Sequence, residues 1–343
     1  DVVISAENTL LANGVNDPEN VTVCVNDIPS GSTIGSETLQ ARMIAMAMNY
    51  GAICKDGGIN MTSAGLTLWR NAVYSLAGLE IPEEPVEAFR KNVAYVTSFA
   101  KLTAEGASDP VVALLEADEN IDLTVIEHDD NDTGGPLDLS GYDAVVAQEA
   151  FGSSSTIYKR GQTLGMGSIS VPFILNKVYA MRDGRGFQDG AAGSGGEVEG
   201  TLAIKVSEEN QSNTLFNGIE FTDGVAQLFL TGGDDNGGSS RTKAMQYAAD
   251  VVISAENTLL ANGINDPENA TVCINDIPAG ATIGSETLQA RMITMAMNYG
   301  AMSQSGDMTS AGLTLWRNAV YSIAGLSVPT EPVEVSGGGA IAE

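Results

Sequence analysis

Short apolar runs of four to six residues, rich in β-branched side chains, alternate with polar stretches through the middle of the chain. Runs that are apolar on successive positions are typical of strands buried on both faces of a parallel sheet. Helical patterns lie between several of these runs, so the sequence predicts an α/β domain. The predicted strands are Val93–Ser98, Asp122–Ile126, Tyr142–Ala147, Val171–Leu175, Leu202–Val206, Val225–Leu230, Thr271–Ile274 and Met292–Met297.

Two helices have clear boundary signals. Asp109 and Pro110 supply a capping side chain and a first-turn proline ahead of an apolar face. Near the C-terminus, Thr309 precedes apolar residues at helical spacing, and Gly325 stands where a helix-terminating glycine belongs. Trp316 lies on the apolar face of this second helix, so we expect it in the core.

Two further segments give a weaker signal. The apolar positions of Met292–Met297 fit a buried strand or a helix, and their spacing does not decide between the two. Residues 182–200 are rich in glycine and poor in large apolar side chains, which predicts a loop or an insertion.

The two ends of the chain carry the same sequence. Residues 1–87 match residues 250–334, with an offset of 249 that falls to 247 after two residues are lost. The first two-thirds of the domain occur once and its last third occurs twice, in a domain of roughly 240 residues. The sequence therefore predicts a partial copy at 1–87, a linker at 88–91, a complete domain at 92–326 and a tail or linker at 327–343.

A third of an α/β domain cannot cover its own strands, because their edges and one face stay open. We expect the partial copy to complete a domain of a neighbouring subunit, or to belong to a longer tandem array. In both arrangements the partner is another copy of the same sequence, joined head to tail. The sequence begins at Asp1 without an initiating methionine, which suggests a removed leader or a segment of a longer polypeptide.

The charge balance narrows the classes of partner. The chain has 44 acidic and 16 basic residues and a formal net charge of −28. Such a surface repels nucleic acid and anionic membranes, and no apolar run is long enough to span a bilayer. An extracellular or cell-surface setting with screening salt fits this charge. The cysteines do not form a disulfide pattern, and we expect Cys24 and Cys273, which match in the two copies, to be buried thiols, while Cys54 has no counterpart.

The order of the elements supports a resemblance. The residues that carry it are Gly141-Tyr142-Asp143, the serine-rich turn 153–155, Val171-Pro172, Asn213–Gly218 and Met308–Val320. This arrangement resembles the flavodoxin-like domains, related to class I glutamine amidotransferases and trehalose-utilisation-type proteins, of secreted bacterial proteins. The resemblance implies a doubly wound, mostly parallel sheet. It also implies an accessory module, since such domains often have no known catalysis.

The sequence lacks the catalytic pair that the amidotransferases use. Those enzymes need a cysteine nucleophile after the third strand and a histidine base beside it. This chain has Gln148-Glu149 at that place, and its one histidine, His128, lies in an acidic loop. A serine nucleophile at 153–155 would also need a base, so a hydrolase is the least favoured function and we expect no enzymatic activity.

Two acidic, glycine-containing loops are the better chemical signal. Carboxylate and amide oxygens on a turn suit Ca²⁺, although neither loop has EF-hand spacing and a merely solvated loop is the alternative. The candidate calcium ligands are Asp129, Asp130 and Asp132 in the first loop and Asp234 and Asp235 in the second. No other cofactor is expected.

Together these patterns favour a structural role. We expect a subunit of an extracellular filament, surface layer or tandem-repeat stalk, assembled head to tail through the partial N-terminal copy. The alternative is an extracellular binding module that holds a glycan or a small ligand at the carboxyl ends of the strands, where doubly wound sheets bind ligands.

Overall fold

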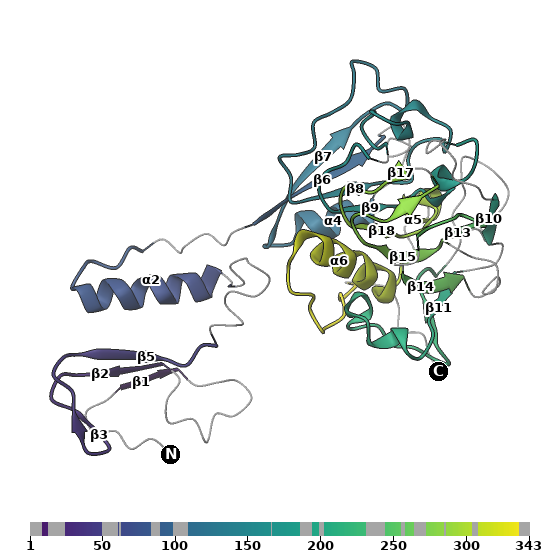
Figure 1. The fold of residues 1–343 in the computed structure, drawn as a ribbon. Helices are drawn as coiled ribbons and strands as arrows, with labels where there is room; N and C mark the ends of the chain where they lie inside the picture. The colour runs from purple at the N-terminus through teal and green to yellow at the C-terminus, as the bar shows by residue number, and fades with distance from the viewer. Residues whose placement is uncertain are drawn as a thin grey trace. The chain divides into compact units, whose positions relative to one another are not determined.

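The computed structural model describes residues 9–12, 25–49, 61, 63–83, 90–98, 109–165, 167–185, 194–198, 202–230, 244–254, 258–263, 272–284, 286–303 and 308–335. The chain divides into two units, Asp1–Phe89 and Arg90–Glu343, and the division falls inside the predicted linker 88–91 (Figure 1). We call them unit 1 and unit 2. None of the helices in the described ranges is long and apolar enough to cross a membrane.

The centre of unit 2 is a nine-stranded sheet with the order β12-β11-β14-β15-β18-β9-β8-β6-β7. Five neighbouring strands of this sheet are parallel. When they are numbered by their order in the chain, they lie across the sheet in the order second, first, third, fourth and fifth. They are β7 (Ile121–Glu127), β6 (Lys91–Thr97), β8 (Ala144–Ala147), β9 (Phe173–Leu175) and β18 (Met292–Thr294).

Four more strands extend the sheet beyond β18 through antiparallel pairs. They are β15 (Ile274–Ile277), β14 (Thr258–Gly263), β11 (Ala203–Lys205) and β12 (Val225–Gln227). Because each antiparallel pair reverses the direction, β15 and β11 run against the other seven strands. The prediction of an α/β fold with a mostly parallel sheet is therefore confirmed.

The parallel strands are covered on both faces. Every residue of β8, β9 and β18 is buried. The helices α4 (Pro110–Glu116) and α6 (Ser310–Ala324) pack against each other and cover one face. In the described part of the connection from β8 to β9, the structure has a short 3-10 turn, Thr156–Tyr158, where a doubly wound fold has a helix.

Both predicted helix boundaries are confirmed. The Asp109 carboxylate accepts hydrogen bonds from the backbone amides of Val111 and Val112, so it caps α4. The Thr309 hydroxyl accepts one from the Gly312 amide at 3.1 Å and caps α6. Gly325 ends α6 with a φ of 70°, a left-handed conformation that favours glycine.

Two predictions need correction, and the structure decides a third that was open between a strand and a helix. The segment 182–200 contains β10 (Ser194–Val198), which pairs with β13 (Met245–Ala249), so the prediction of a loop is wrong there. The strand predicted at Thr271–Ile274 is β15 and begins at Ile274. The methionine-rich segment is a strand over Met292–Thr294, because pairing with β9 on one side and β15 on the other fixes its conformation.

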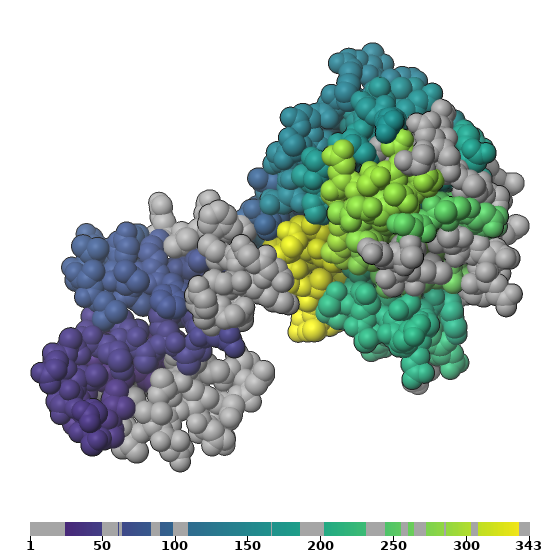
Figure 2. Space-filling view, in the orientation of Figure 1, coloured from purple at the N-terminus to yellow at the C-terminus, as the bar shows by residue number. Residues whose placement is uncertain are grey.

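The segment after α6 is not a simple tail over its described length. The Asn217 side chain donates to the Val328 carbonyl, and in Figure 2 the yellow C-terminal part of unit 2 borders the green of residues 202–230. The Val333 backbone bonds the hydroxyls of Ser310 and Thr314, and Arg317 donates to the Glu331 carbonyl at 2.6 Å. The predicted tail or linker at 327–343 is therefore part of the domain as far as residue 335.

Unit 1 has the elements of residues 250–334 of unit 2, which we call the closing third of the domain. Figure 1 shows the helix α2 (Ser63–Ala77) beside a three-stranded sheet. The sheet consists of β1 (Thr9–Ala12), β2 (Val25–Ile28) and β5 (Met43–Met46), and a small hairpin pairs β3 (Thr33–Ile34) with β4 (Glu37–Thr38). The counterparts in unit 2 are β14, β15, β18, α6 and the hairpin of β16 (Thr282–Ile283) and β17 (Glu286–Thr287).

The internal contacts of the two copies also agree. Arg42 binds both carboxylate oxygens of Asp27 and the Ser75 hydroxyl. Arg291 makes the same bonds to Asp276 and Ser322 in unit 2. The local fold of the closing third is therefore the same in both units.

The surroundings of the shared helix differ between the copies. Trp316 of α6 is 0 % exposed, whereas Trp69 at the same place in α2 is 40 % exposed. In both copies the indole N–H points to a methionine sulfur at 3.1 Å, Met297 in unit 2 and Met48 in unit 1. Only the cover over the helix therefore distinguishes the two tryptophans.

This contrast makes a matched test of stability. We expect Trp316→Ala to lower the free energy of unfolding of unit 2 by about 3–5 kcal/mol, because it opens a cavity in the core. Trp69→Ala should cost roughly half of that or less, since 40 % of this residue is exposed and fewer contacts are lost. Urea unfolding followed by far-ultraviolet circular dichroism measures both. Equal losses in the two variants would contradict the structure.

Candidate functional site

A network of buried polar side chains lies at the carboxyl ends of the parallel strands, where doubly wound sheets bind ligands. Tyr95, at the end of β6, donates a hydrogen bond to the Asp109 carboxylate and accepts one from Gln148, which follows β8. Asn176, which follows β9, donates to the Gln148 side-chain oxygen. The network thus links three neighbouring strands and the start of α4.

An ion pair lies beside this network. Lys177 contacts one carboxylate oxygen of Glu149, and both side chains are buried. The second oxygen of Glu149 accepts from the Tyr299 amide at 2.9 Å, and the Asn176 side chain accepts from the Met297 amide at 2.7 Å. These bonds join the two parts of the domain, because the amides belong to the duplicated closing third and the acceptors do not.

Burial changes the acidity of several groups here. It raises the pKa of the Asp109 carboxyl despite the hydrogen bonds from Tyr95 and the α4 amides. It also raises the pKa of Tyr95 well above its usual range, with a further contribution from the Asp109 charge. Tyr299, at the start of α5 (Tyr299–Ser303), has a raised pKa for the same two reasons. Tyr95 and Tyr299 are therefore neutral hydroxyl groups at ordinary pH.

The network is closed by its own contacts. Glu149 uses both carboxylate oxygens, and the Asn176 and Gln148 amides bond to each other and to the backbone. Buried polar groups that satisfy one another stabilise a unique packing and present few groups to a ligand. The geometry therefore fits a structural junction between the strands better than a substrate site.

The serine-rich turn and the histidine are engaged separately. His128 contacts the Asp132 carboxylate, and the Ser155 hydroxyl donates to Asp130 at 3.1 Å. In the part of the chain that the structure describes, no hydrogen bond joins His128 to Ser153, Ser154 or Ser155. A serine nucleophile needs an adjacent general base that is itself oriented, and Ser155 with Asp130 supplies a carboxylate without an imidazole.

The first acidic loop is organised by contacts within the protein. The Asp132 carboxylate accepts from the backbone and the hydroxyl of Thr163, and Asp129 accepts from the backbone amides of Asn131 and Thr133. Asp132 has a φ of 56°, which an aspartate tolerates in a tight turn. The Asp130 carboxylate accepts a hydrogen bond from the Ser155 hydroxyl. Hydrogen bonds to three carboxylates therefore hold the shape of this loop.

The calcium prediction stays untested. Among the described residues, no group of three or more histidine, cysteine, aspartate or glutamate side chains is arranged to hold a metal ion. Asp234 and Asp235 lie outside the described residues, as do Cys24 and Cys54. Cys273 is a buried free thiol, as predicted, and burial raises its pKa to about 12.

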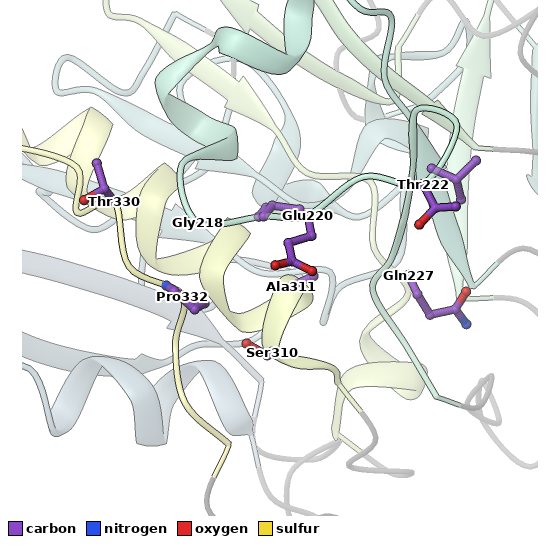
Figure 3. A pocket seen from close by; sticks show the side chains of 10 residues that line it. Gly218, Glu220, Thr222, Gln227, Ser310, Ala311, Thr330 and Pro332 are labelled. Atoms are coloured by element: carbon purple, nitrogen blue, oxygen red, sulfur yellow. The ribbon is translucent and has the colours of Figure 1, made fainter. Parts of the chain in front are cut away.

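A groove of about 860 Å³ lies at the N-terminus of α6. Figure 3 shows the exposed carboxylate of Glu220 turned toward the first residues of this helix, near Ala311. The N-terminus of a helix attracts negative charge, and Glu220 already supplies it. A second hollow, of about 440 Å³, lies between residues 136–140 and 160–170. Neither hollow is lined by residues 149–155, which follow β8 at the carboxyl ends of the parallel strands.

The apolar face of unit 1 is the remaining candidate. We call it the open face, and define it as the exposed side chains of Leu68, Trp69, Val73 and Leu76 on α2, together with the edge strand β5. Val73 is 54 % exposed, whereas its counterpart Val320 is 0 % exposed. Large contiguous apolar surfaces of this kind mark interaction sites.

The raised pKa of Asp109 gives a test of the buried network. Because the folded pKa lies above the unfolded value near 3.8, folding favours the protonated carboxyl. The stability that this group adds is complete below the unfolded pKa and is lost as the pH rises through the folded pKa. Asp109→Asn keeps a capping side chain without the charge, so we expect the variant to gain stability relative to the wild type as the pH rises above the unfolded pKa near 3.8. Urea unfolding over this range measures the difference.

Two controls accompany that measurement. Asp109→Ala removes the cap and should cost about 0.5–2 kcal/mol. Asp138→Asn should show the opposite pH dependence, because hydrogen bonds from Ser140 lower the pKa of Asp138 in the folded chain. A pH-independent difference between wild type and Asp109→Asn would mean that this carboxyl is not desolvated.

Comparisons of the chain with models of known protein families, with curated proteins and with solved structures find no match. The features that bear on its function are therefore the geometry of unit 2 and the open face of unit 1.

Proposed function

We propose that the chain is a structural component of an extracellular or cell-surface assembly of repeated domains, in which unit 1 completes a neighbouring domain. The observation that carries this proposal is the contrast between two copies of one helix. The same apolar residues are buried in α6 and exposed in α2. A domain duplicated for catalysis would be copied whole, whereas a closing third with an open face is suited to joining.

The fold of unit 2 supports an accessory role. We propose that residues 92–326 are a variant of the flavodoxin-like class, since the parallel strands follow the order second-first-third-fourth-fifth that this class uses. The polar network at the carboxyl ends is closed by its own contacts, and His128 and Ser155 bond to different aspartates. These features favour a structural module over a hydrolase or a small-ligand receptor.

The charge supports the proposed location. A net charge of −28 keeps such modules apart and soluble unless specific apolar faces meet. Salt outside the cell screens this repulsion within a Debye length of about 8 Å at physiological strength. We therefore propose that assembly depends on the open face and requires a saline medium.

The proposal is tested by building the repeat. Polypeptides with one, two or three copies of residues 1–249 ahead of residues 250–343 should form linear particles. Each added copy should lengthen the particle by roughly 45 Å, the diameter of a compact domain of about 240 residues. Negative-stain electron microscopy and small-angle X-ray scattering measure this increment. A matched polypeptide whose extra copy lacks residues 90–249 should gain no folded domain, because it adds residues 1–89 without a segment to cover them. Compact particles that do not lengthen would contradict the proposal.

A further inference from the structure

We propose that the open face of unit 1 is the docking surface for a second copy of residues 90–249 of this chain. This inference rests on the proposed function and names its partner. Unit 2 identifies this partner, because it contains the same closing third with its covering residues in place. What covers α6 and β18 in unit 2 identifies what fits α2 and β5.

The cover over α6 and β18 includes three elements of residues 90–249 that make extensive contacts. The strand β9 pairs in parallel with β18, with Phe173 opposite Met292 and Ile174 opposite Ile293. The helix α4 packs against α6. The 3-10 turn η5 (Thr214–Phe216) also packs against α6. Docking on unit 1 would therefore pair β5 with a second copy of β9 and place Met43 and Ile44 in the register of Met292 and Ile293.

Polar contacts fix the position of the cover as well as apolar ones. The Asn318 side chain donates to the backbone carbonyls of Leu215 and Asn217 at 3.0 and 2.8 Å. The Tyr321 hydroxyl donates to the Asp118 carboxylate at 2.8 Å. These bonds are directional, so they define one position of residues 90–249, which we call the opening segment, against the helix.

Unit 1 retains the side chains that make these contacts. Asn71 and Tyr74 stand at the places of Asn318 and Tyr321, and each is partly exposed. The apolar positions Leu68, Trp69 and Val73 are identical to their counterparts. Within α2 and β5 two residues differ from their counterparts. Leu76 for Ile323 conserves volume, and Ala45 for Thr294 removes a hydroxyl that bonds only within the closing third. A second copy of residues 90–249 would thus find the same partners on unit 1.

The numbers of closing thirds and opening segments in each chain show that an intact second chain is not the partner that covers the open face. Each chain has two closing thirds, 1–87 and 250–334, and one opening segment. If unit 1 displaced residues 250–334 of a neighbour, the displaced segment would expose the same face. The number of uncovered closing thirds would stay at one per chain, so exchange among identical chains gains no buried surface. A tandem array, in which every closing third follows its own opening segment, covers this face on all but the terminal unit.

The experiment adds the missing segment to the full chain. A copy of residues 90–249 is joined ahead of Asp1, so that the junction Ala249–Asp1 repeats the natural junction Ala249–Asp250. The added copy contains no tryptophan, and the chain has two, of which Trp69 is exposed and Trp316 is buried. We expect acrylamide quenching of Trp69 to be lost in the extended chain. We also expect hydrogen exchange at the backbone amides of β5 and α2 to slow.

A matched variant separates docking from unrelated effects. Val73→Glu should leave quenching unchanged in the original chain, where this side chain is exposed, and should restore quenching of Trp69 in the extended chain. Persistent quenching of Trp69 in the extended chain would overturn the inference, whether or not the added segment folds. So would a dimer of the original chain in which Trp69 is protected, because the occupant would then be an intact second copy.

The two proposals fail in different ways. Linear particles with a quenchable Trp69 would retain the structural array and reject this docking surface. Protection of Trp69 in a polypeptide that forms no linear particles would retain the docking surface and reject the array.

Discussion

The closing third of the domain depends on the opening segment to cover one apolar helix face and one strand edge. In unit 2 this cover buries Trp316 and Val320 and pairs β18 with β9. In unit 1 the same residues form the same helix and sheet, and the face stays open. Burial of such side chains is the main favourable term in folding, and a strand edge without a partner is a site of association. The two units are therefore the covered and uncovered forms of one structure.

The carboxyl ends of the parallel strands strengthen the same junction. In unit 2, Glu149 and Asn176 accept hydrogen bonds from backbone amides of the closing third. Lys177 pairs with Glu149, and a buried charge without such a partner would be costly. A place where related folds bind ligands is thus filled by contacts that hold the opening and closing parts together. This use of polar groups agrees with a domain whose two parts must recognise each other.

Much of the fold follows from local patterns. The caps Asp109 and Thr309 and the terminating Gly325 were readable because each satisfies backbone groups within a few residues. The strands β13 and β14 were not predicted, since Met-Gln-Tyr-Ala-Ala and Thr-Leu-Leu-Ala-Asn-Gly have weak strand propensity. Pairing with strands that are distant in the chain decides their conformation, and the sequence of one segment does not specify which strands it pairs with.

The candidate site shows the same division. In the sequence Glu149 is only a departure from an enzyme motif, and no local pattern joins it to Lys177 or Tyr299. These residues are separated by up to 150 positions and meet because parallel strands end at one edge of the sheet. A lysine two residues after a buried strand, in Phe-Ile-Leu-Asn-Lys, is the one signal in the sequence that could point to the pair.

By itself, the sequence determined that the chain contains one opening segment and two closing thirds, and where the helix that the thirds share begins and ends. The repeat is visible because the two copies have nearly the same sequence, and the helix boundaries depend on residues that are neighbours along the chain. Only the tertiary structure decided which copy of the helix is buried and which residues cover it. Burial depends on segments more than 100 residues apart in the chain, such as Asn318 and Leu215, whose contact no local pattern encodes.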